Sequence, residues 1–305
     1  MVLNPNNPYF KQVQLLVRVL PTVAEHPVFA LKGGTAINLF VRDLPRLSVD
    51  IDLAYEPVKT RAESLADIHW NLDQIAQKLT KQGLSIQKNH PQETTRLTVS
   101  NGQVQIKIET SPVLRGTVHP TRLMTVTPTV ESLFGYAETQ MLSFEDLYAG
   151  KLCAALDRQH PRDLYDVKTL LNQEGISDCL KDTFLVYLIS HQRPIHELLN
   201  PNFKDITDIY RSEFSNMTQD NVAIEALVSA RYNMVQQLQT QLNEKDKAFL
   251  LSLKSTRPDW SLFAYPQAAE LPAVKWKLHN LSRMHAKEHQ ASFAKLETLL
   301  NKIGL

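Results

Sequence analysis

The distribution of glycine limits what this chain can fold into. The sequence of 305 residues contains nine glycines; eight occur at or before Gly175, and the run from Ile176 to Ile303 has none. Tight turns and strand connections often need a residue with positive φ, which glycine supplies, whereas helical hairpins can more often do without one. We therefore expect one part of the chain to contain a sheet and the other to consist of helices.

Charge and composition exclude several classes of protein. The chain has 33 Lys and Arg against 32 Asp and Glu, a net charge of +1, and 43% hydrophobic residues. This apolar content suffices for one large or two ordinary cores, which excludes disordered and collagen-like chains. A histone-like role is also excluded, because long-range steering of nucleic acid needs a net field. Any contact with nucleic acid must use local patches.

Cysteine content and hydropathy favour a soluble cytoplasmic protein. Cys153 and Cys179 are the two cysteines, too few for a disulfide framework, and neither lies in a CxxC motif. The N-terminus lacks the basic and apolar regions of a signal peptide. The longest uncharged apolar stretch, Phe184 to Ile189, is much shorter than the roughly 20 residues that span a bilayer.

Periodicity predicts the elements of the N-terminal part. Apolar and polar residues alternate over 47–53, as in a half-buried strand, and Asn101-Gly102 lies between two further strand-like segments, as in a hairpin. The expected elements are helices at 12–24, 35–41 and 61–82, and strands at 28–31, 47–53, 84–87, 94–99 and 104–109. This order indicates an α+β (or α/β) domain with a small mixed or antiparallel sheet.

After Pro128 the pattern becomes helical. Apolar residues recur at helical spacing in several segments, which predict an all-α bundle. Helices are expected at 144–155, 163–171, 226–242, 245–254, 273–284 and 288–303. No repeat or low-complexity linker separates the two parts, and we place the domain boundary between residues 143 and 144.

The segment Ser48-Val49-Asp50-Ile51-Asp52 carries two closely spaced carboxylates. Alternate residues of a strand point to one face, so Ser48, Asp50 and Asp52 are expected to project together. Like charges so close are costly unless a cation neutralises them, and oxygen ligands on one rigid strand suit Mg²⁺. The alternative is an ordinary solvated strand end.

Lys32-Gly33-Gly34-Thr35 lies between a predicted strand and a predicted helix. Backbone N–H groups at a helix start can hold an anion, and paired glycines let a phosphate approach the main chain. The alternative is a tight turn with a capping threonine. The glycine pair and the aspartate pair, in this order, indicate a phosphate site beside a metal site, which is the arrangement of nucleotide phosphoryl chemistry.

Four blocks of the sequence together resemble the AbiEii/AbiGii toxin family of DNA-polymerase-β-like nucleotidyltransferases, found in bacterial type IV toxin–antitoxin and phage-defence systems. The blocks are Lys32-Gly33-Gly34-Thr35-Ala36, residues 46–53 (RLSVDIDL), residues 151–156 (KLCAAL) and residues 162–167 (RDLYDV). Three later segments, 249–250, 258–260 and 271–280, resemble the C-terminal helical region of that family. The resemblance covers most of the chain.

The resemblance implies an enzyme with a nucleotidyltransferase-fold domain at 1–143 and a helical domain at 144–305 that contributes Lys151 and Asp166 to the active-site cleft. The implied reaction is metal-dependent transfer of a nucleoside monophosphate from an NTP to an acceptor hydroxyl, by resemblance the 3′ end of tRNA, which stops translation and growth. The implied cofactor is Mg²⁺ or Mn²⁺. The implied partners are NTP, tRNA and an antitoxin that acts without stable binding; no membrane is expected. Two alternatives stay open: a protein-modifying nucleotidyltransferase or kinase, and a nucleotide-binding regulator without turnover.

The resemblance also implies roles for residues of the N-terminal domain. Gly33, Gly34 and Thr35 would hold the terminal phosphates, with Lys32, Arg46 and Ser48 beside them, and Asp50 and Asp52 would bind the metal. For Ser48 the resemblance implies contact with a phosphate or modification when the toxin is silenced; the alternative is a small polar strand residue. For Arg46 the alternative is a surface arginine. A third carboxylate normally comes from a neighbouring strand, and Glu109 is the best candidate, with an exposed hairpin charge as its alternative.

In the helical domain, the resemblance assigns Lys151 to the triphosphate and Asp166 to orienting the lysine or the nucleotide. Taken by its own physics, Lys151 lies at the apolar stripe of its helix, which also fits a structural salt bridge. Asp166 could instead pair with Arg162 at i, i+4. Asp163 is interpreted as a first-turn residue favoured by the helix dipole.

The last part of the chain is basic. From Glu270 to the end there are six Lys and Arg and three Asp and Glu, with Trp276 among them. This could form an RNA-binding edge, and the alternative is an ordinary amphipathic helix.

Overall fold

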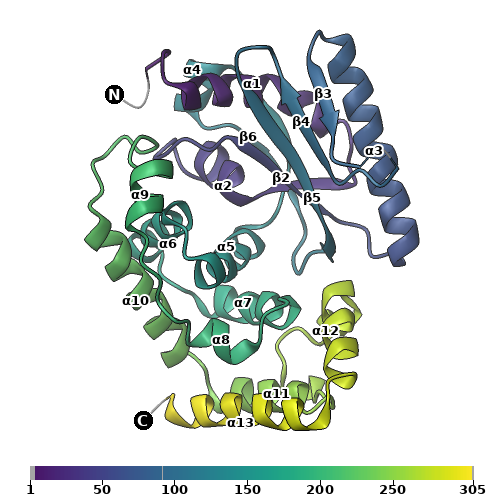
Figure 1. Cartoon of the computed structure of the whole chain (residues 1–305), viewed down its shortest axis with the longest axis vertical. Coiled ribbons are helices and arrows are strands. Elements are labelled where there is room, and N and C mark those ends of the chain that lie inside the picture. The colour runs from purple at the N-terminus through teal and green to yellow at the C-terminus, as the bar shows by residue number, and fades with distance from the viewer. Residues whose placement is uncertain (1–3, 91, 304–305) are drawn as a thin grey trace. The chain divides into compact units, whose positions relative to one another are not determined.

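A mixed seven-stranded sheet organises the N-terminal part of the chain (Figure 1). This computed structural model describes residues 4–90 and 92–303. The order of the strands across the sheet is β3-β4-β5-β2-β1-β7-β6. Their bounds are β1 Phe29–Lys32, β2 Asp50–Tyr55, β3 Ser85–Lys88, β4 Arg96–Ser100, β5 Gln105–Arg115, β6 Arg122–Thr125 and β7 Glu138–Met141. The predicted α+β class is confirmed.

The central strands are β1, β2 and β5. β2 runs antiparallel to β1 and parallel to β5, and its alternation buries Ile51 and Leu53 while Asp50 and Asp52 stay half-buried. β4 and β5 form the predicted hairpin, in which Ser100 pairs with Gln105 and Gly102 has a φ of 87°. The predicted strand at 47–53 is displaced, since β2 begins at Asp50.

Helices cover the sheet. α1 (Pro8–Ala24) and α3 (Arg61–Lys81) contact each other and pack on the strands, α1 on β5 and β7, α3 on β3, β4 and β5. α3 begins with a capping box between Thr60 and Glu63, which satisfies N–H groups at the helix start. The predicted helix at 35–41 is one α-helical turn, α2 (Gly33–Ala36), followed by a π-helix, η1 (Ile37–Val41).

β6 and β7 were not predicted: β6 lies in a segment before Pro128 to which no element was assigned, and β7 lies after Pro128, where the pattern was interpreted as helical. A helix does follow Pro128, α4 (Pro128–Phe134), but it is short. β7 then has Thr139 and Met141 buried and pairs with β1 at Leu31. Four residues hold too few alternations for the strand period to be distinguished from a helical stripe.

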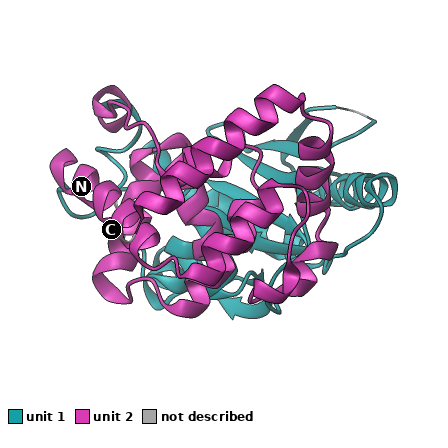
Figure 2. Cartoon of the chain, turned by 90° about the horizontal axis from the view of Figure 1, so that it is seen from below, with its two compact units in different colours: residues 1–147, 211–222 teal, residues 148–210, 223–305 magenta. Residues whose placement is uncertain are grey.

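The chain forms two compact units, residues 1–147 with 211–222, and residues 148–210 with 223–305 (Figure 2). The predicted helical domain, 144–305, includes residues 211–222. In the structure this segment belongs to the unit that contains the sheet: Leu47 N–H donates to the carbonyl of Met217 (2.8 Å), and Arg46 forms a β-bridge with Thr218.

The second unit is helical; the first residues of α5 and the last residues of α9 belong to the first unit. Its helices are α5 Phe144–Arg158, α6 Pro161–Gln173, α7 Asp178–Ser190, α8 Ile195–Leu199, α9 Thr207–Glu213, α10 Ile224–Thr240, α11 Glu244–Lys254, α12 Pro272–Ser282 and α13 Ala286–Lys302, with short 3₁₀ turns η2 Trp260–Leu262 and η3 Pro266–Glu270. α7, α8 and α9 were not among the predicted helices. α7 is buried on nearly all sides, so it has no single apolar stripe. No helix in residues 4–90 and 92–303 is both long and apolar enough to cross a bilayer.

The centre of the sheet gives a first prediction. Ile108 of β5 is fully buried, and we expect Ile108→Ala to lower the free energy of unfolding of the first unit by about 2–5 kcal/mol because it leaves a cavity. Thermal unfolding followed by calorimetry measures this change. Gln105→Ala, at an exposed position of the same strand, is the control and should change the free energy by less than about 0.5 kcal/mol. Equal effects of the two substitutions would contradict the assigned core.

Candidate active site

The junction of β1 and α2 brings the glycine pair against β2. β1 ends at Lys32, which pairs in register with Asp52, and Gly33 follows with a φ of +74°. A Cβ at Gly33 would overlap the Asp52 carboxylate. A Cβ at Gly34 would lie 2.7 Å from Arg46 Nη2 and 2.8 Å from Ser48 Oγ. Only glycine permits this close approach at both positions.

Thr35 ties the start of the helix to β2. Its side chain is fully buried, its hydroxyl donates to the carbonyl oxygen of Asp50 (2.5 Å), and it lies 3.1 Å from Ser48 Oγ. Lys32 is the N-cap of α2 and makes no side-chain capping bond. The alternative of a capping threonine is therefore wrong, because the Thr35 hydroxyl is used between elements. Any phosphate contact at this residue would have to come from its backbone.

Arg46 is buried. It is 2% exposed, and its Nη1 donates to the carbonyl of Leu47 (2.9 Å) while Nη2 faces Gly34. The alternative of a surface arginine is wrong, because the segment around Arg46 is covered by residues 217–219 through the bridge to Thr218. Ser48 is also buried, at 7% exposure. A positive charge and a hydroxyl thus lie directly beside the glycine pair.

The carboxylates lie on neighbouring strands. Asp50 and Asp52 occupy alternate positions of β2, and β5 places Lys107 opposite Asp50 and Glu109 opposite Asp52. Residues in register on adjacent strands lie about 4.8 Å apart and project to one face. Glu109 is therefore beside Asp52, although its side chain is 40% exposed and lies 3.6 Å from Arg96.

The arrangement of these carboxylates can be compared with what Mg²⁺, the metal that the family resemblance implies, requires of its ligands. Within the described residues, no group of three Asp, Glu, His or Cys side chains is gathered closely enough to hold a metal ion. Mg²⁺ is usually bound by one or two carboxylates, with water and substrate phosphates completing the octahedron. Asp50 and Asp52, two oxygen donors on one strand face, fit that requirement. Glu109 as a third ligand stays a prediction.

Lys151 and Asp166 meet in the helical unit. Lys151 Nζ on α5 lies 3.0 Å from Asp166 Oδ2 and 2.8 Å from Asp163 Oδ1, both on α6. Arg158 Nε and Nη2 donate to the same Asp163 carboxylate (2.5 and 3.0 Å). The cluster therefore contains two cations and two anions, and Lys151, Asp163 and Asp166 are each at most 6% exposed.

Sequence reasoning missed the role of Asp163, which it interpreted only as a first-turn residue. Asp163 does lie in the first turn of α6, but it is also the centre of the cluster. Burial alone would raise the pKa of Asp163; the ammonium of Lys151 and the guanidinium of Arg158 outweigh it and hold the pKa well below its usual range. The sequence feature that could have indicated this role is the turn at His160-Pro161, which folds α6 back so that Asp163 faces both Arg158 and Lys151.

A family profile and a solved structure are similar to this chain. A family profile described as nucleotidyl transferase AbiEii toxin, type IV TA system, matches residues 14–280. The solved structure of MenT4, a nucleotidyltransferase toxin from Mycobacterium tuberculosis H37Rv, is similar in fold, with a TM-score of 0.59 and 14% sequence identity over 94% of this chain and 93% of that one. No curated protein sequence matches the chain significantly.

The buried cluster gives a prediction on pH. The pKa of Asp163 is lower in the folded than in the unfolded chain, so the unfolded chain binds more protons in acid. The stability that Asp163 contributes is complete above its unfolded pKa of about 3.9 and is lost as the pH falls below that value. At neutral pH, Asp163→Asn should lower the free energy of unfolding by about 3–5 kcal/mol, because it breaks the buried ion pair with Lys151.

The measurement is the melting temperature of both proteins from pH 7 to pH 3. We expect the difference in melting temperature between wild type and Asp163→Asn to narrow as the pH falls below about 4, the unfolded pKa of an aspartate. Asp178→Asn, an exposed first-turn aspartate on α7, is the control and should leave the pH profile unchanged. A gap that stays constant over this range would contradict the depressed pKa.

Proposed function

Since the chain belongs to the AbiEii family of nucleotidyltransferase toxins from type IV toxin–antitoxin systems, we propose that it transfers a nucleoside monophosphate from an NTP to the 3′-terminal hydroxyl of tRNA. The observation that carries the proposal is the contact of Gly33 and Gly34 with Asp52, Arg46 and Ser48. This contact places the Gly33-Gly34 backbone, where a phosphate would bind, beside the strand that bears two carboxylates.

The triphosphate would bind at the start of the helical segment 33–41. Backbone N–H groups are unpaired at a helix start, and the glycines leave the main chain accessible because they have no Cβ. The buried guanidinium of Arg46 adds fixed positive charge beside Gly34. Such preorganised groups stabilise charge on the phosphate oxygens without reorganising during the reaction.

In the proposed step, the acceptor hydroxyl oxygen forms a bond to the α-phosphorus of the NTP. The bond from that phosphorus to the bridging oxygen breaks, pyrophosphate leaves with the electron pair, and the hydroxyl proton passes to one of the carboxylates of β2 and β5, Asp50, Asp52 or Glu109. Asp50 and Asp52 would hold Mg²⁺ or Mn²⁺, which when bound supplies charge neutralisation for the phosphates. The protein mainly positions the reacting groups.

For Lys151, two roles compete. Its place in a buried cluster with Asp163 and Asp166 supports a structural salt bridge, and the family resemblance supports binding of the triphosphate. The two roles combine if the carboxylates hold the ammonium in one orientation. We propose this combination, with Asp166 as the residue that positions Lys151.

Modification of the tRNA 3′ end would prevent aminoacylation and so stop growth, consistent with a toxin. An antitoxin belongs to the family's systems. We propose that it counteracts the toxin without forming a stable complex.

The reaction is tested with the purified protein, each α-³²P-labelled NTP in turn, Mg²⁺, and either total RNA or a lysate depleted of nucleic acid. We expect label in tRNA, and a loss of at least 100-fold in Asp50→Asn and Asp52→Asn, because either change removes a charge that neutralises the metal–phosphate centre. Glu131→Gln, an exposed carboxylate of α4, is the control and should keep full activity.

Other outcomes are equally decisive. Label in protein rather than RNA would establish a protein-modifying enzyme, and NTP binding without transfer would establish a regulator. Full activity in both aspartate variants would reject the assignment of β2 as the catalytic strand.

The role of Lys151 is tested by comparing Lys151→Ala with Asp163→Asn. Both substitutions break the same buried cluster, but only the first removes the ammonium. At a temperature at which both variants are folded, we expect transfer by Lys151→Ala to fall at least tenfold below that of Asp163→Asn, with a higher KM for NTP. Equal activities of the two variants would show that Lys151 acts only through stability.

A further inference from the structure

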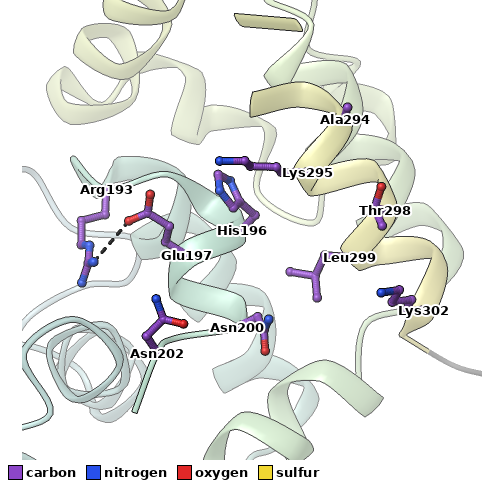
Figure 3. Close-up of a pocket in the computed structure, with 10 residues that line it drawn as sticks. All are labelled: Arg193, His196, Glu197, Asn200, Asn202, Ala294, Lys295, Thr298, Leu299 and Lys302. Carbon is purple, nitrogen blue, oxygen red and sulfur yellow. Dashed lines mark hydrogen bonds and ion pairs between the residues drawn. The ribbon is translucent and has the colours of Figure 1, made fainter. Parts of the chain in front are cut away.

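A cavity of about 610 Å³ lies in the helical unit between the α8 region and α13 (Figure 3). One wall comes from residues 193–202 and the other from the last three turns of α13. The carboxylate in this lining belongs to Glu197, and it pairs with Arg193 at 3.2 Å. Basic side chains that reach the cavity without that neutralisation are Lys295 and Lys302, both exposed.

Both lysines are available to a ligand. No carboxylate in the described part of the chain forms an ion pair with Lys295 or Lys302. They lie seven residues apart on one helix, which places them about 10 Å apart along its axis. Two cations at this separation can contact two phosphates of one strand. Asn200 and Asn202 add amide donors to the opposite wall.

Further positive charge lies behind the cavity. Lys254 on α11 is 5% exposed, and no carboxylate of the described residues pairs with it. Burial lowers the pKa of the His196 ring, and the ammonium groups of Lys295 and Lys254 lower it further against the opposing effect of Glu197. The His196 ring therefore lies close to both ammonium groups where it lines the cavity.

The wall that carries Arg193 is held in place by Lys277. This buried ammonium donates to the carbonyls of His191 (2.7 Å) and Arg193 (2.6 Å), just after α7. Of the basic residues expected at an RNA-binding edge over 270–305, Lys277 is therefore buried, while Lys295 and Lys302 of α13 are exposed. The cavity wall is fixed before any ligand binds.

We propose that this cavity binds the phosphodiester backbone of the acceptor RNA. Phosphate is favoured because the lining offers two free ammonium groups and amide donors. Contacts to the backbone, rather than to bases, are favoured because the lining has no Phe, Tyr or Trp on which a base could stack. The choice of RNA as the source of the phosphates rests on the proposed function.

The test uses fluorescein-labelled tRNA and fluorescence anisotropy at several salt concentrations. For the full-length double variant Lys295→Glu/Lys302→Glu, we expect the Kd to rise at least tenfold at low salt. The slope of log Kd against log salt should fall by about 1.4 to 1.8, since each phosphate contact contributes about 0.7 to 0.9. Lys287→Glu, on the same helix and outside the cavity, should change the Kd less than twofold.

A second double variant, Lys295→Gln/Lys302→Gln, removes the two charges without reversing them and is less disruptive to folding. The melting temperatures of both double variants, compared with that of wild type, detect any folding defect. Unchanged affinity and slope in both double variants would overturn the proposal. Loss of Mg²⁺–ATP binding with RNA binding retained would also overturn it, since the cavity would then bind a nucleotide.

Failure of this inference can be distinguished from failure of the proposed function. If wild type labels tRNA but the lysine variants bind it normally, only the cavity assignment fails. If RNA binding depends on the lysines but no label is transferred from any NTP, the cavity assignment stands and the proposed reaction fails.

Discussion

The candidate active site depends on one register, the antiparallel pairing of β1 with β2 in which Lys32 faces Asp52. This pairing sets Gly33 against the Asp52 carboxylate and lets Thr35 bond to the backbone of Asp50. A shift by one residue would turn both aspartates to the opposite face of the sheet. The buried residues that alternate with the aspartates, Ile51 and Leu53, oppose that shift, because it would expose them to water.

Local patterns were enough to predict the parts of this site but not its surroundings. Alternation in β2 and the glycine pair are visible within a few residues, so the site segments were identified from sequence. The burial of Arg46 depends on a contact with Thr218, far along the chain, and no spacing rule predicts such a pairing. Asp163 was underestimated for a similar reason: its partners Lys151 and Arg158 lie on the other side of a helix turn. β7 was too short, and α7 too uniformly apolar, for a period to be recognised.

The buried cluster of the helical unit constrains how its residues can be interpreted. Lys151, Asp163 and Asp166 are buried, so each of these three charges is expensive to leave unpaired, whereas the side chain of Arg158 is 63% exposed. Loss of any one of the three buried charges therefore acts on stability whatever else that residue does. Any variant of these three residues loses stability. A functional role for Lys151 or Asp166 can be established only if its variant loses more NTP binding or transfer than that loss of stability explains. A second variant of the same cluster is the appropriate reference for this comparison.

A net charge of +1 argues against long-range attraction of nucleic acid, but it does not argue against local contacts. A nearly neutral chain has no long-range field to steer a polyanion, but local charges suffice for contact. The cavity offers two lysines, Lys295 and Lys302, and so few phosphate contacts provide limited, salt-sensitive affinity. Backbone contacts also carry no sequence information. If the acceptor is RNA, its selection must therefore come from the geometry of its terminal hydroxyl at the reacting phosphate, and the cavity would supply attachment rather than recognition.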